Sequence, residues 1–121
     1  MDISGHWIEK LFATIDCMDA HAFAGFLTPN GRFCFGNQPA LRGRAEIEQA
    51  VAGFFAILKR LKHRLRERWL VDDTAIITGV VTYERHDGKT LEAPFANVLG
   101  FGPDGIHDYR IYVDTSALFA E

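Results

Sequence analysis

The sequence has few of the residues on which several classes of protein depend. Its 121 residues include only two cysteines, Cys17 and Cys34, and no C-x-x-C spacing. A disulfide scaffold, a zinc site and thioredoxin-type chemistry have no support, and a reducing, cytoplasmic location is expected. No run reaches the roughly 18 apolar residues of a membrane-spanning helix. Residues 1–10 lack the basic and apolar regions of a signal peptide, so no association with a membrane is expected.

Phosphate-binding loops and metal-ligand motifs are also missing. G-x-x-x-x-G-K-[ST] does not occur, and the one G-x-G-x-x-G spacing, Gly100–Gly105, falls at a turn signal between two strand-like runs and not before a helix, so the sequence predicts no nucleotide cofactor. The five histidines have neither H-x-x-x-H nor H-x-H spacing, and we expect no metal. Any chemistry of this protein is therefore expected to proceed without a cofactor.

Positive charge is in slight deficit. The chain has 13 Lys and Arg against 16 Asp and Glu, a net charge of -3, although six of the basic residues lie between Lys59 and Arg68. A groove for nucleic acid would use such a row together with exposed aromatic residues. Because the whole chain is acidic, we favour a solvated strand face or ion pairs at a dimer edge, and expect no nucleic-acid partner.

Aromatic residues, in contrast, are abundant, with ten Phe, three Tyr and two Trp. A domain of this size buries only about two-thirds of the surface of its unfolded chain. We therefore expect the rings to divide among a core, the lining of a pocket and a subunit interface. Phe95, Phe101 and Tyr109 are predicted to lie at the interface, on the alternate face of the last two strands.

Apolar residues recur at helical spacing in the first half of the chain. Asp19 stands where its side chain can cap a second, short helix, and Gly43 opens a third. The first half is thus predicted to hold helices at 6–18, from Asp19 through Leu27 and from Gly43 through Leu58, a turn at 28–31, and a short strand at 32–35.

The second half is rich in alternating and β-branched runs separated by turn signals, a pattern typical of an antiparallel meander. Helices followed by strands indicate the α+β class. Three helices can cover only one face of the sheet, so a homodimer is expected to cover the other. The predicted strands are 63–71, 74–86, 90–101 and 106–114.

Three segments, in their order and spacing, resemble the SnoaL-like polyketide cyclase family of the nuclear-transport-factor-2-like superfamily. They are Phe33–Pro39 with Gly43–Ala45 following, Val81–Gly88, and Arg110–Asp114. The resemblance covers nearly the whole chain and implies one SnoaL-like domain, residues 1–121. It also implies a cone in which a curved mixed or antiparallel sheet wraps around three N-terminal helices. The apolar pocket of such a cone implies a small apolar organic molecule as partner.

The resemblance points to Asp114 as a general acid or base, because this family carries an Asp at the end of the last strand. An apolar cavity would raise the pKa of this carboxyl group toward neutrality; alternatively, Asp114 caps the turn that follows. His63 opens the first strand of the meander beside an apolar row, as a second acid–base candidate or as a strand-end hydrogen-bonding group. Asn37 matches the Asn with which related epoxide hydrolases position water.

Aromatic residues near these positions are the expected ligand contacts. Trp69 is assigned because strict alternation puts it on the face of His63, and Tyr112 because it shares a face with Asp114. The full predicted lining set is Phe35, Phe54, Trp69, Tyr83 and Tyr112.

These residues suggest a cofactor-independent cyclase or isomerase that uses Asp acid–base chemistry. Epoxide hydrolase-like water addition by Arg85, Asp87 and Asp114 is one alternative, although Asp87 precedes a glycine in a hairpin signal that favours the solvent-exposed tip. A non-catalytic ligand-binding or dimerisation domain is another. The mechanism of ketosteroid isomerase fits less well, because the aligned positions, near Ala96 and Leu11, offer no side-chain donor.

Overall fold

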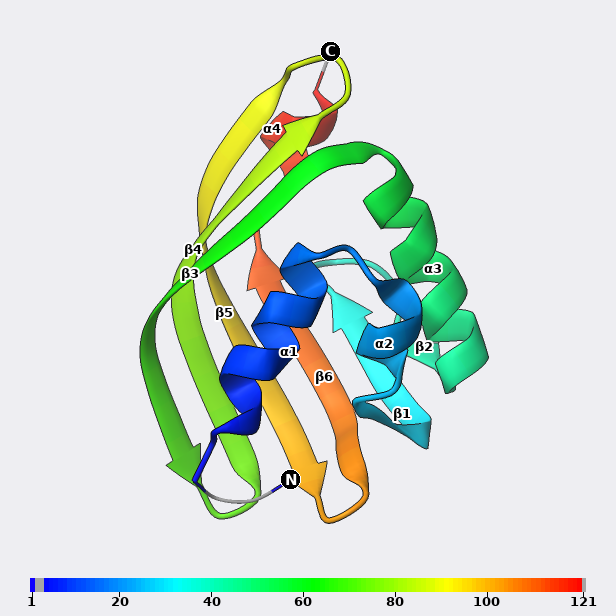
Figure 1. Cartoon of the computed structure of the whole chain (residues 1–121), viewed down its shortest axis with the longest axis vertical. Helices are drawn as coiled ribbons and strands as arrows, with labels where there is room; N and C mark the ends of the chain where they lie inside the picture. The colour runs from blue at the N-terminus through cyan, green and yellow to red at the C-terminus, as the bar shows by residue number, and fades with distance from the viewer. Residues whose placement is uncertain (2–3, 121) are drawn as a thin grey trace.

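Three helices lie against one face of a six-stranded sheet (Figure 1). The computed structural model describes residue 1 and residues 4–120. The helices are α1 (Trp7–Asp16), α2 (Ala20–Ala24), α3 (Arg44–Ala56) and a short α4 (Ser116–Phe119). The strands are β1 (Leu27–Phe35), β2 (Leu41–Arg42), β3 (Leu58–Val71), β4 (Thr74–Arg85), β5 (Thr90–Gly102) and β6 (Gly105–Val113).

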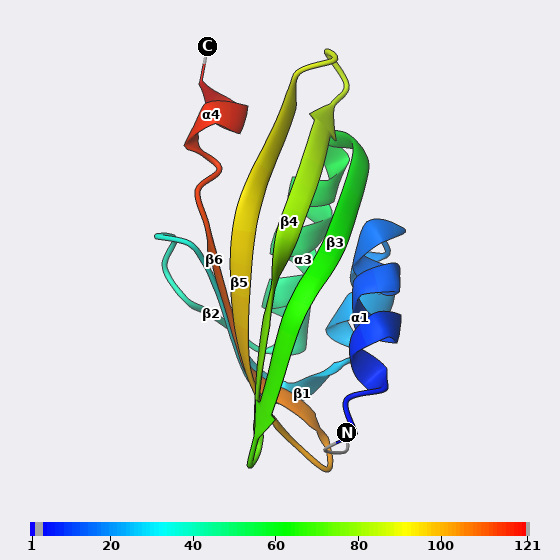
Figure 2. The ribbon, with the colours of Figure 1, turned by 90° about the vertical axis from the view of Figure 1, so that its left-hand side faces the viewer.

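The sheet has the order β2-β1-β6-β5-β4-β3. Every neighbouring pair is antiparallel except β1 and β6, which run parallel. Strands β3–β5 curve past α3 on the outside, with α1 beside β3 (Figure 2). The predicted α+β class, the meander and the curved mixed sheet around N-terminal helices are therefore confirmed.

Helix boundaries follow the local chemistry only in part. The Asp19 side chain accepts a hydrogen bond from the backbone N–H of Ala22 at 3.0 Å, so the predicted cap of α2 is confirmed. The expected turn at 28–31 is wrong, because these residues belong to β1. The register of β1 against β6 shifts across this stretch, between Leu27 and Arg32. Leu27 and Leu58, both expected to lie on helices, instead begin β1 and β3.

A bulge in β3 changes which side chains face the helices. The register against β4 shifts between Leu65 and Glu67, so one extra residue stands on β3 there. A bulge of this kind inverts the alternation beyond it. His63, before the bulge, pairs with the buried Val81 and faces inward, whereas Trp69 pairs with Ile76 on the outer face.

The last strand also presents a different face from the one expected. Phe95, Phe101 and Tyr109, predicted at a subunit interface, are all buried in the core, at 5%, 3% and 0% exposure. The inner face of β6 carries Tyr109 and the outer face carries Tyr112, because alternate residues of a strand point to opposite faces. These three rings therefore pack under the helices.

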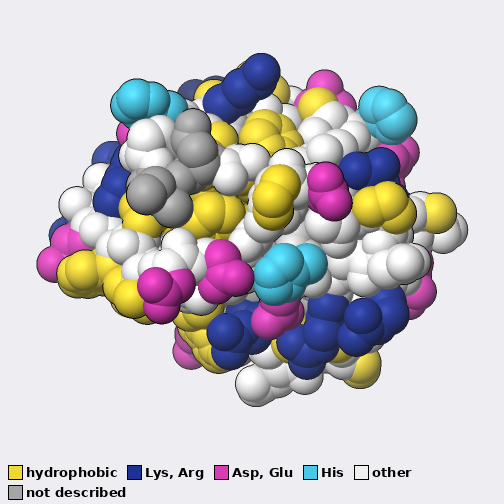
Figure 3. All heavy atoms as spheres, turned by 90° about the horizontal axis from the view of Figure 1, so that it is seen from below, with side chains coloured by type: hydrophobic (Ala, Val, Ile, Leu, Met, Phe, Trp, Pro, Cys, Tyr) yellow, Lys and Arg dark blue, Asp and Glu magenta, His cyan; other side chains and the backbone are white. Residues whose placement is uncertain are grey.

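The basic residues of β3 pair with acidic side chains of the same chain. Arg60 lies 3.5 Å from Glu84, Arg64 lies 3.2 Å from Glu92, and Lys59 lies 3.9 Å from Glu84. Seen from below, the surface of the molecule carries side chains of both signs of charge (Figure 3). The row on β3 is thus a solvated strand face with internal ion pairs. In the described part of the chain, no helix has the length and apolar character needed to cross a bilayer.

Candidate functional site

The space between the sheet and the helices contains a cavity of about 1130 Å³. Ligand pockets commonly have volumes of about 300–1,000 Å³, so this cavity has room for a molecule of several rings. Residues of α1–α4, of β1–β6 and of the loop after β1 contribute to its wall. The lining residues that bear on function are Phe35, Asn37, Phe54, His63, Tyr83, Asn97, Tyr109, Tyr112 and Asp114.

Aromatic rings form one wall of the cavity. The Phe54 ring centroid lies 5.4 Å from Phe35, 5.8 Å from Tyr83 and 6.4 Å from Phe119 on α4. Burial raises the pKa of the Tyr83 hydroxyl above its ordinary value of 10.0, so that hydroxyl stays neutral. Three of the predicted lining residues therefore give the cavity an apolar surface with one neutral hydroxyl. They are Phe35, Phe54 and Tyr83.

His63 lies on the cavity wall and is held by Asp16, the last residue of α1. The ring Nδ1 is 2.6 Å from Asp16 Oδ1, and the His63 backbone N–H donates to Asp16 Oδ2 at 3.0 Å. Both side chains are largely buried, with exposures of 11% and 19%. Because a carboxylate only accepts hydrogen bonds, Nδ1 carries a proton, and in the neutral ring Nε2 is the nitrogen with the lone pair.

Two aromatic rings fix the plane of this imidazole. Phe12 and Phe95 each lie 5.1 Å from the His63 ring, in edge-on geometry. Phe12 comes from α1 and Phe95 from β5, so the ring is held between a helix and the sheet. Fixed orientation and a fixed tautomer are the properties that a general base needs.

A second polar pair lies on the inner faces of β5 and β6. Asn97 is 2% exposed, and its Nδ2 donates to the Tyr109 hydroxyl at 3.4 Å. Asn97 Oδ1 is buried and has no hydrogen-bond partner among the described residues. Burial raises the pKa of Tyr109 above its ordinary value, with the Asn97 hydrogen bond acting in the opposite direction. This pair is therefore neutral and incompletely satisfied.

Asp114 borders the mouth of the cavity but is exposed to solvent. Its Oδ1 accepts from the Ser116 hydroxyl at 2.7 Å and from the Ser116 backbone N–H at 3.0 Å. These two hydrogen bonds lower the pKa of Asp114 below 3.8, so the expected rise in that pKa is wrong. Asp114 is the cap of the following turn, the alternative that its sequence position left open.

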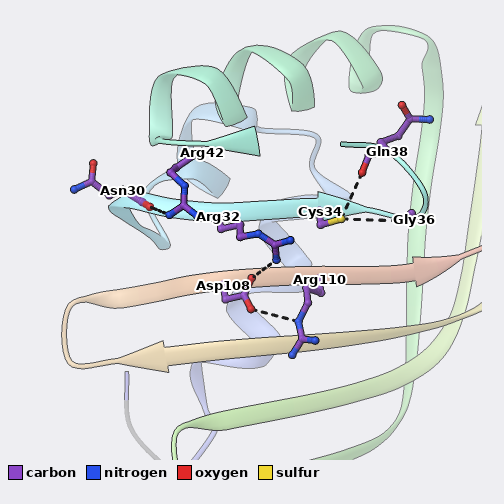
Figure 4. Close-up of polar contacts among 8 residues, drawn as sticks. All are labelled: Asn30, Arg32, Cys34, Gly36, Gln38, Arg42, Asp108 and Arg110. Atoms are coloured by element: carbon purple, nitrogen blue, oxygen red, sulfur yellow. Dashed lines mark hydrogen bonds and ion pairs between the residues drawn. The ribbon is translucent and has the colours of Figure 1, made fainter. Parts of the chain in front are cut away.

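Asn37 lies in the exposed loop that follows β1, at the same mouth. This loop is tied to the end of β1 by the Cys34 thiol, which lies 3.5 Å from the Gln38 carbonyl and 3.9 Å from that of Gly36 (Figure 4). The Gly36 backbone N–H also donates to Ile111 at 2.9 Å. Asn37 therefore stands on an anchored loop at the rim, whereas His63 lies on the inner wall.

The outer face beside this loop is charged. Asp108 lies between Arg32, at 3.2 Å, and Arg110, at 3.3 Å (Figure 4). All three side chains come from β1 and β6 and point away from the helices. They are structural ion pairs on the outer face and do not line the cavity.

Two predicted ligand contacts lie outside the buried aromatic wall. Trp69 is 47% exposed and is not part of the cavity wall, because the bulge in β3 turns it outward. Tyr112 borders the mouth, but it is 52% exposed and occupies the outer face of β6. Neither ring forms part of the buried aromatic wall.

The pair that would serve an epoxide hydrolase lies away from the cavity wall. Arg85 donates to the Leu118 carbonyl at 2.9 Å and lies 2.9 Å from Asp87. Asp87 is at the turn between β4 and β5, and its Oδ1 accepts from the Lys89 backbone N–H. Arg85 thus joins α4 to the sheet, and Asp87 closes a hairpin turn at the solvent-exposed tip.

Sequence reasoning missed Asp16, Asn97 and Tyr109 as site residues. Asp16 follows Phe12 by four residues, so it continues the apolar face of α1, where a carboxylate needs a partner. Asn97 interrupts an apolar strand at an inward position, which is a comparable signal. Among the described residues, no group of three or more His, Cys, Asp and Glu side chains could hold a metal ion.

Several solved structures have a fold similar to that of this protein. A hypothetical protein with a ketosteroid isomerase-like fold from Catenulispora acidiphila DSM 44928, in complex with trimethylamine, has a TM-score of 0.81 and 16% identity over 96% of this chain and 88% of its own. TerC, co-crystallised with polyporic acid, has a TM-score of 0.82 and 16% identity, over 97% and 95%.

A protein of unknown function from Burkholderia pseudomallei K96243, described as nuclear-transport-factor-2-like, has a TM-score of 0.85 and 12% identity over 98% of this chain and 95% of its own. At such identities these similarities show the fold alone. Comparison with curated proteins gives no match. The SnoaL-like domain family matches residues 8–107, most of the chain. This protein therefore belongs to the SnoaL-like domain family, and its fold is nuclear-transport-factor-2-like.

Proposed function

We propose that this protein binds a small, largely apolar organic molecule in its cavity and catalyses the transfer of a proton from one atom of that molecule to another, as a cofactor-independent isomerase or cyclase does. The observation that carries the proposal is the His63–Asp16 pair on the cavity wall. Asp16 holds the imidazole at 2.6 Å with the proton on Nδ1. The free Nε2 can then take a proton from a bound molecule.

The surroundings of His63 favour an uncharged substrate. The wall is aromatic, and burial raises the pKa values of the tyrosines Tyr83 and Tyr109, so neither hydroxyl becomes a phenolate. Removal of a proton from the carbon next to a ketone needs one positioned base, and at the oxygen it needs a group that donates a hydrogen bond to the developing enolate or a proton to give the neutral enol. We therefore propose cyclic ketones as the substrate class, with Asn37 and Asp114 as rim residues at the entrance of the cavity.

Exchange of carbon-bound hydrogen tests this proposal without knowledge of the product. We would incubate 2-tetralone, a bicyclic ketone, with the protein in deuterated water and follow the loss of its α-proton signals by NMR. The wild-type protein should accelerate exchange, and His63→Gln should reduce the acceleration about a hundredfold. Thr82→Val, on the outer face of β4, is the control and should behave as wild type. Exchange that is equally fast in His63→Gln would contradict the role of His63.

The same assay compares the two proton carriers and the non-catalytic alternative. Asp114→Asn should retain most of the exchange activity if His63 is the base, and should lose it if the Asp114 carboxylate is. A thermal-shift screen with aromatic polyketides, terpenoid epoxides and steroids reports binding separately, since a ligand stabilises the folded state by mass action. Binding without exchange would leave a ligand-binding domain and overturn the catalytic proposal.

A homodimer through the outer face of the sheet is a second proposal. Half-buried apolar side chains at Ile76, Val80 and Val98 lie on that face beside the exposed Tyr112. A second copy would cover this apolar strip, as subunit packing commonly does. Sedimentation equilibrium at micromolar concentration tests it: a dimer is expected, and a monomer would contradict the proposal.

A further inference from the structure

Asn97 is a polar residue that is buried in the described part of the chain. It is 2% exposed, it lines the cavity, and its Oδ1 is buried without a hydrogen-bond partner among the described residues. A buried polar atom left without a partner destabilises the folded state. A bound molecule that supplies the missing partner would remove this destabilisation.

The Tyr109 hydroxyl completes the arrangement. It accepts from Asn97 Nδ2 at 3.4 Å, so its own O–H proton is available to another acceptor. Tyr109 is fully buried, and the rings of Phe23 and Phe33, at 5.4 and 5.5 Å, hold it in place. Asn97 and Tyr109 both line the cavity, and together they have one unused acceptor, Asn97 Oδ1, and one unused donor, the Tyr109 O–H.

A single functional group matches both. A neutral hydroxyl can donate to Asn97 Oδ1 and accept from the Tyr109 O–H at the same time, whereas an ether can only accept and an anion would lose its hydration in a neutral, desolvated site. Turning the amide by half a revolution exchanges the donor and acceptor roles, and a hydroxyl still satisfies both groups.

We propose that Asn97 and Tyr109 form the recognition point of the cavity for a neutral enolic or phenolic hydroxyl on the ligand. The proposal rests on the proposed function, because the enol of a cyclic ketone carries such a hydroxyl. Phe95 lies two residues before Asn97 on the inner face of β5 and touches the His63 ring at 5.1 Å. The recognition point and the base thus share one wall of the cavity.

Two matched probes test this assignment. The first is 2-naphthol, a stable analogue of the enol of 2-tetralone, and the second is 2-methoxynaphthalene, which has the same rings but no hydroxyl proton. Titration calorimetry near neutral pH should show wild-type protein binding 2-naphthol about tenfold or more tightly than the ether. In Asn97→Leu and in Tyr109→Phe this preference should fall to about twofold or less, while Thr82→Val should keep it.

Each outcome has a separate meaning. Equal affinity of the wild-type protein for both probes, or an unchanged preference in Asn97→Leu, would overturn the recognition point and leave the binding cavity standing. If neither probe binds, both the proposed function and this inference are overturned. Should Asn97→Leu fail to fold, the NMR signals of the Asn97 side-chain NH₂ in wild-type protein decide: they should shift with 2-naphthol and not with the ether.

Discussion

Replacement of Asp16 by asparagine should invert the tautomer of His63 while leaving the fold intact. In the wild-type protein both carboxylate oxygens accept, one from ring Nδ1 at 2.6 Å and one from the His63 backbone N–H at 3.0 Å. A side-chain amide has one acceptor and one donor group. The backbone N–H cannot become an acceptor, so the amide oxygen of the variant must face it and the NH₂ must face the ring. The ring can respond by moving its proton to Nε2.

The energetic cost is set by the loss of charge. A hydrogen bond to a charged group contributes about 1.5–3 kcal/mol and a neutral one about 0.5–1.5 kcal/mol, so Asp16→Asn should cost about 1 kcal/mol. For a chain of this length that lowers Tm by about 3–6 °C. Asp16→Ala removes both acceptors and should cost more, about 2–4 kcal/mol.

The tautomer is read from long-range ¹H–¹⁵N correlation spectra of the imidazole, at a pH where histidines are neutral. The wild-type spectrum should show Nδ1–H and the Asp16→Asn spectrum Nε2–H, with proton-exchange activity on 2-tetralone reduced about a hundredfold or more. Asp19→Asn is the matched control, since Asn and Asp cap helices equally well. An Nδ1–H tautomer that persists in Asp16→Asn would refute the reasoning.

Two further predictions concern stability. A Cβ at Gly79 would lie 2.2 Å from the Arg64 carbonyl oxygen and 3.0 Å from the Phe95 ring, so Gly79→Ala should force the β3 bulge to move and lower Tm strongly. Gly53 lies in α3 with open space around it, so Gly53→Ala should raise the free energy of unfolding by about 0.5–1 kcal/mol. Thermal melts of both variants check this, and a silent Gly79→Ala would contradict it. The pKa of Asp114 is lowered by folding, so its stabilising contribution is fully present above the ordinary value of 3.8 and is lost as the pH falls through the lower folded value. Asp114→Asn should therefore lower Tm at neutral pH by an amount that disappears in acid, and a difference independent of pH would exclude this linkage.

The order of elements could be predicted from the sequence because periodicity and turn chemistry are local signals. Asp19 caps α2 through a contact three residues away, and the four-strand meander follows from hydrophobic alternation between turns. The helical state expected for Leu58 is wrong because a residue directly after a helix fits either period. What decides its strand state is pairing with Arg85, a partner far along the chain.

The candidate site depended on side-chain direction, which the sequence encodes less well. One bulged residue between Leu65 and Glu67 moves Trp69 from the expected cavity face to the outer face. A bulge of this kind has no reliable sequence signal, although Gly79 directly opposite Leu65 is a hint that two backbones approach closely there. The partnership of Asp16 with His63 joins residues 47 positions apart, so only the folded chain brings it out.

The central claim is that the cavity itself binds a neutral ring compound, and blocking the cavity tests it most directly. Ala93 lies on the inner face of β5 and lines the cavity, whereas Ala96 lies on the outer face of the same strand. Calorimetric titration of 2-naphthol should show binding to wild type and to Ala96→Phe, and a loss of about tenfold or more in Ala93→Phe, with cooperative melts for all three. Equal affinity in Ala93→Phe, or no binding to the wild-type protein, would contradict the account.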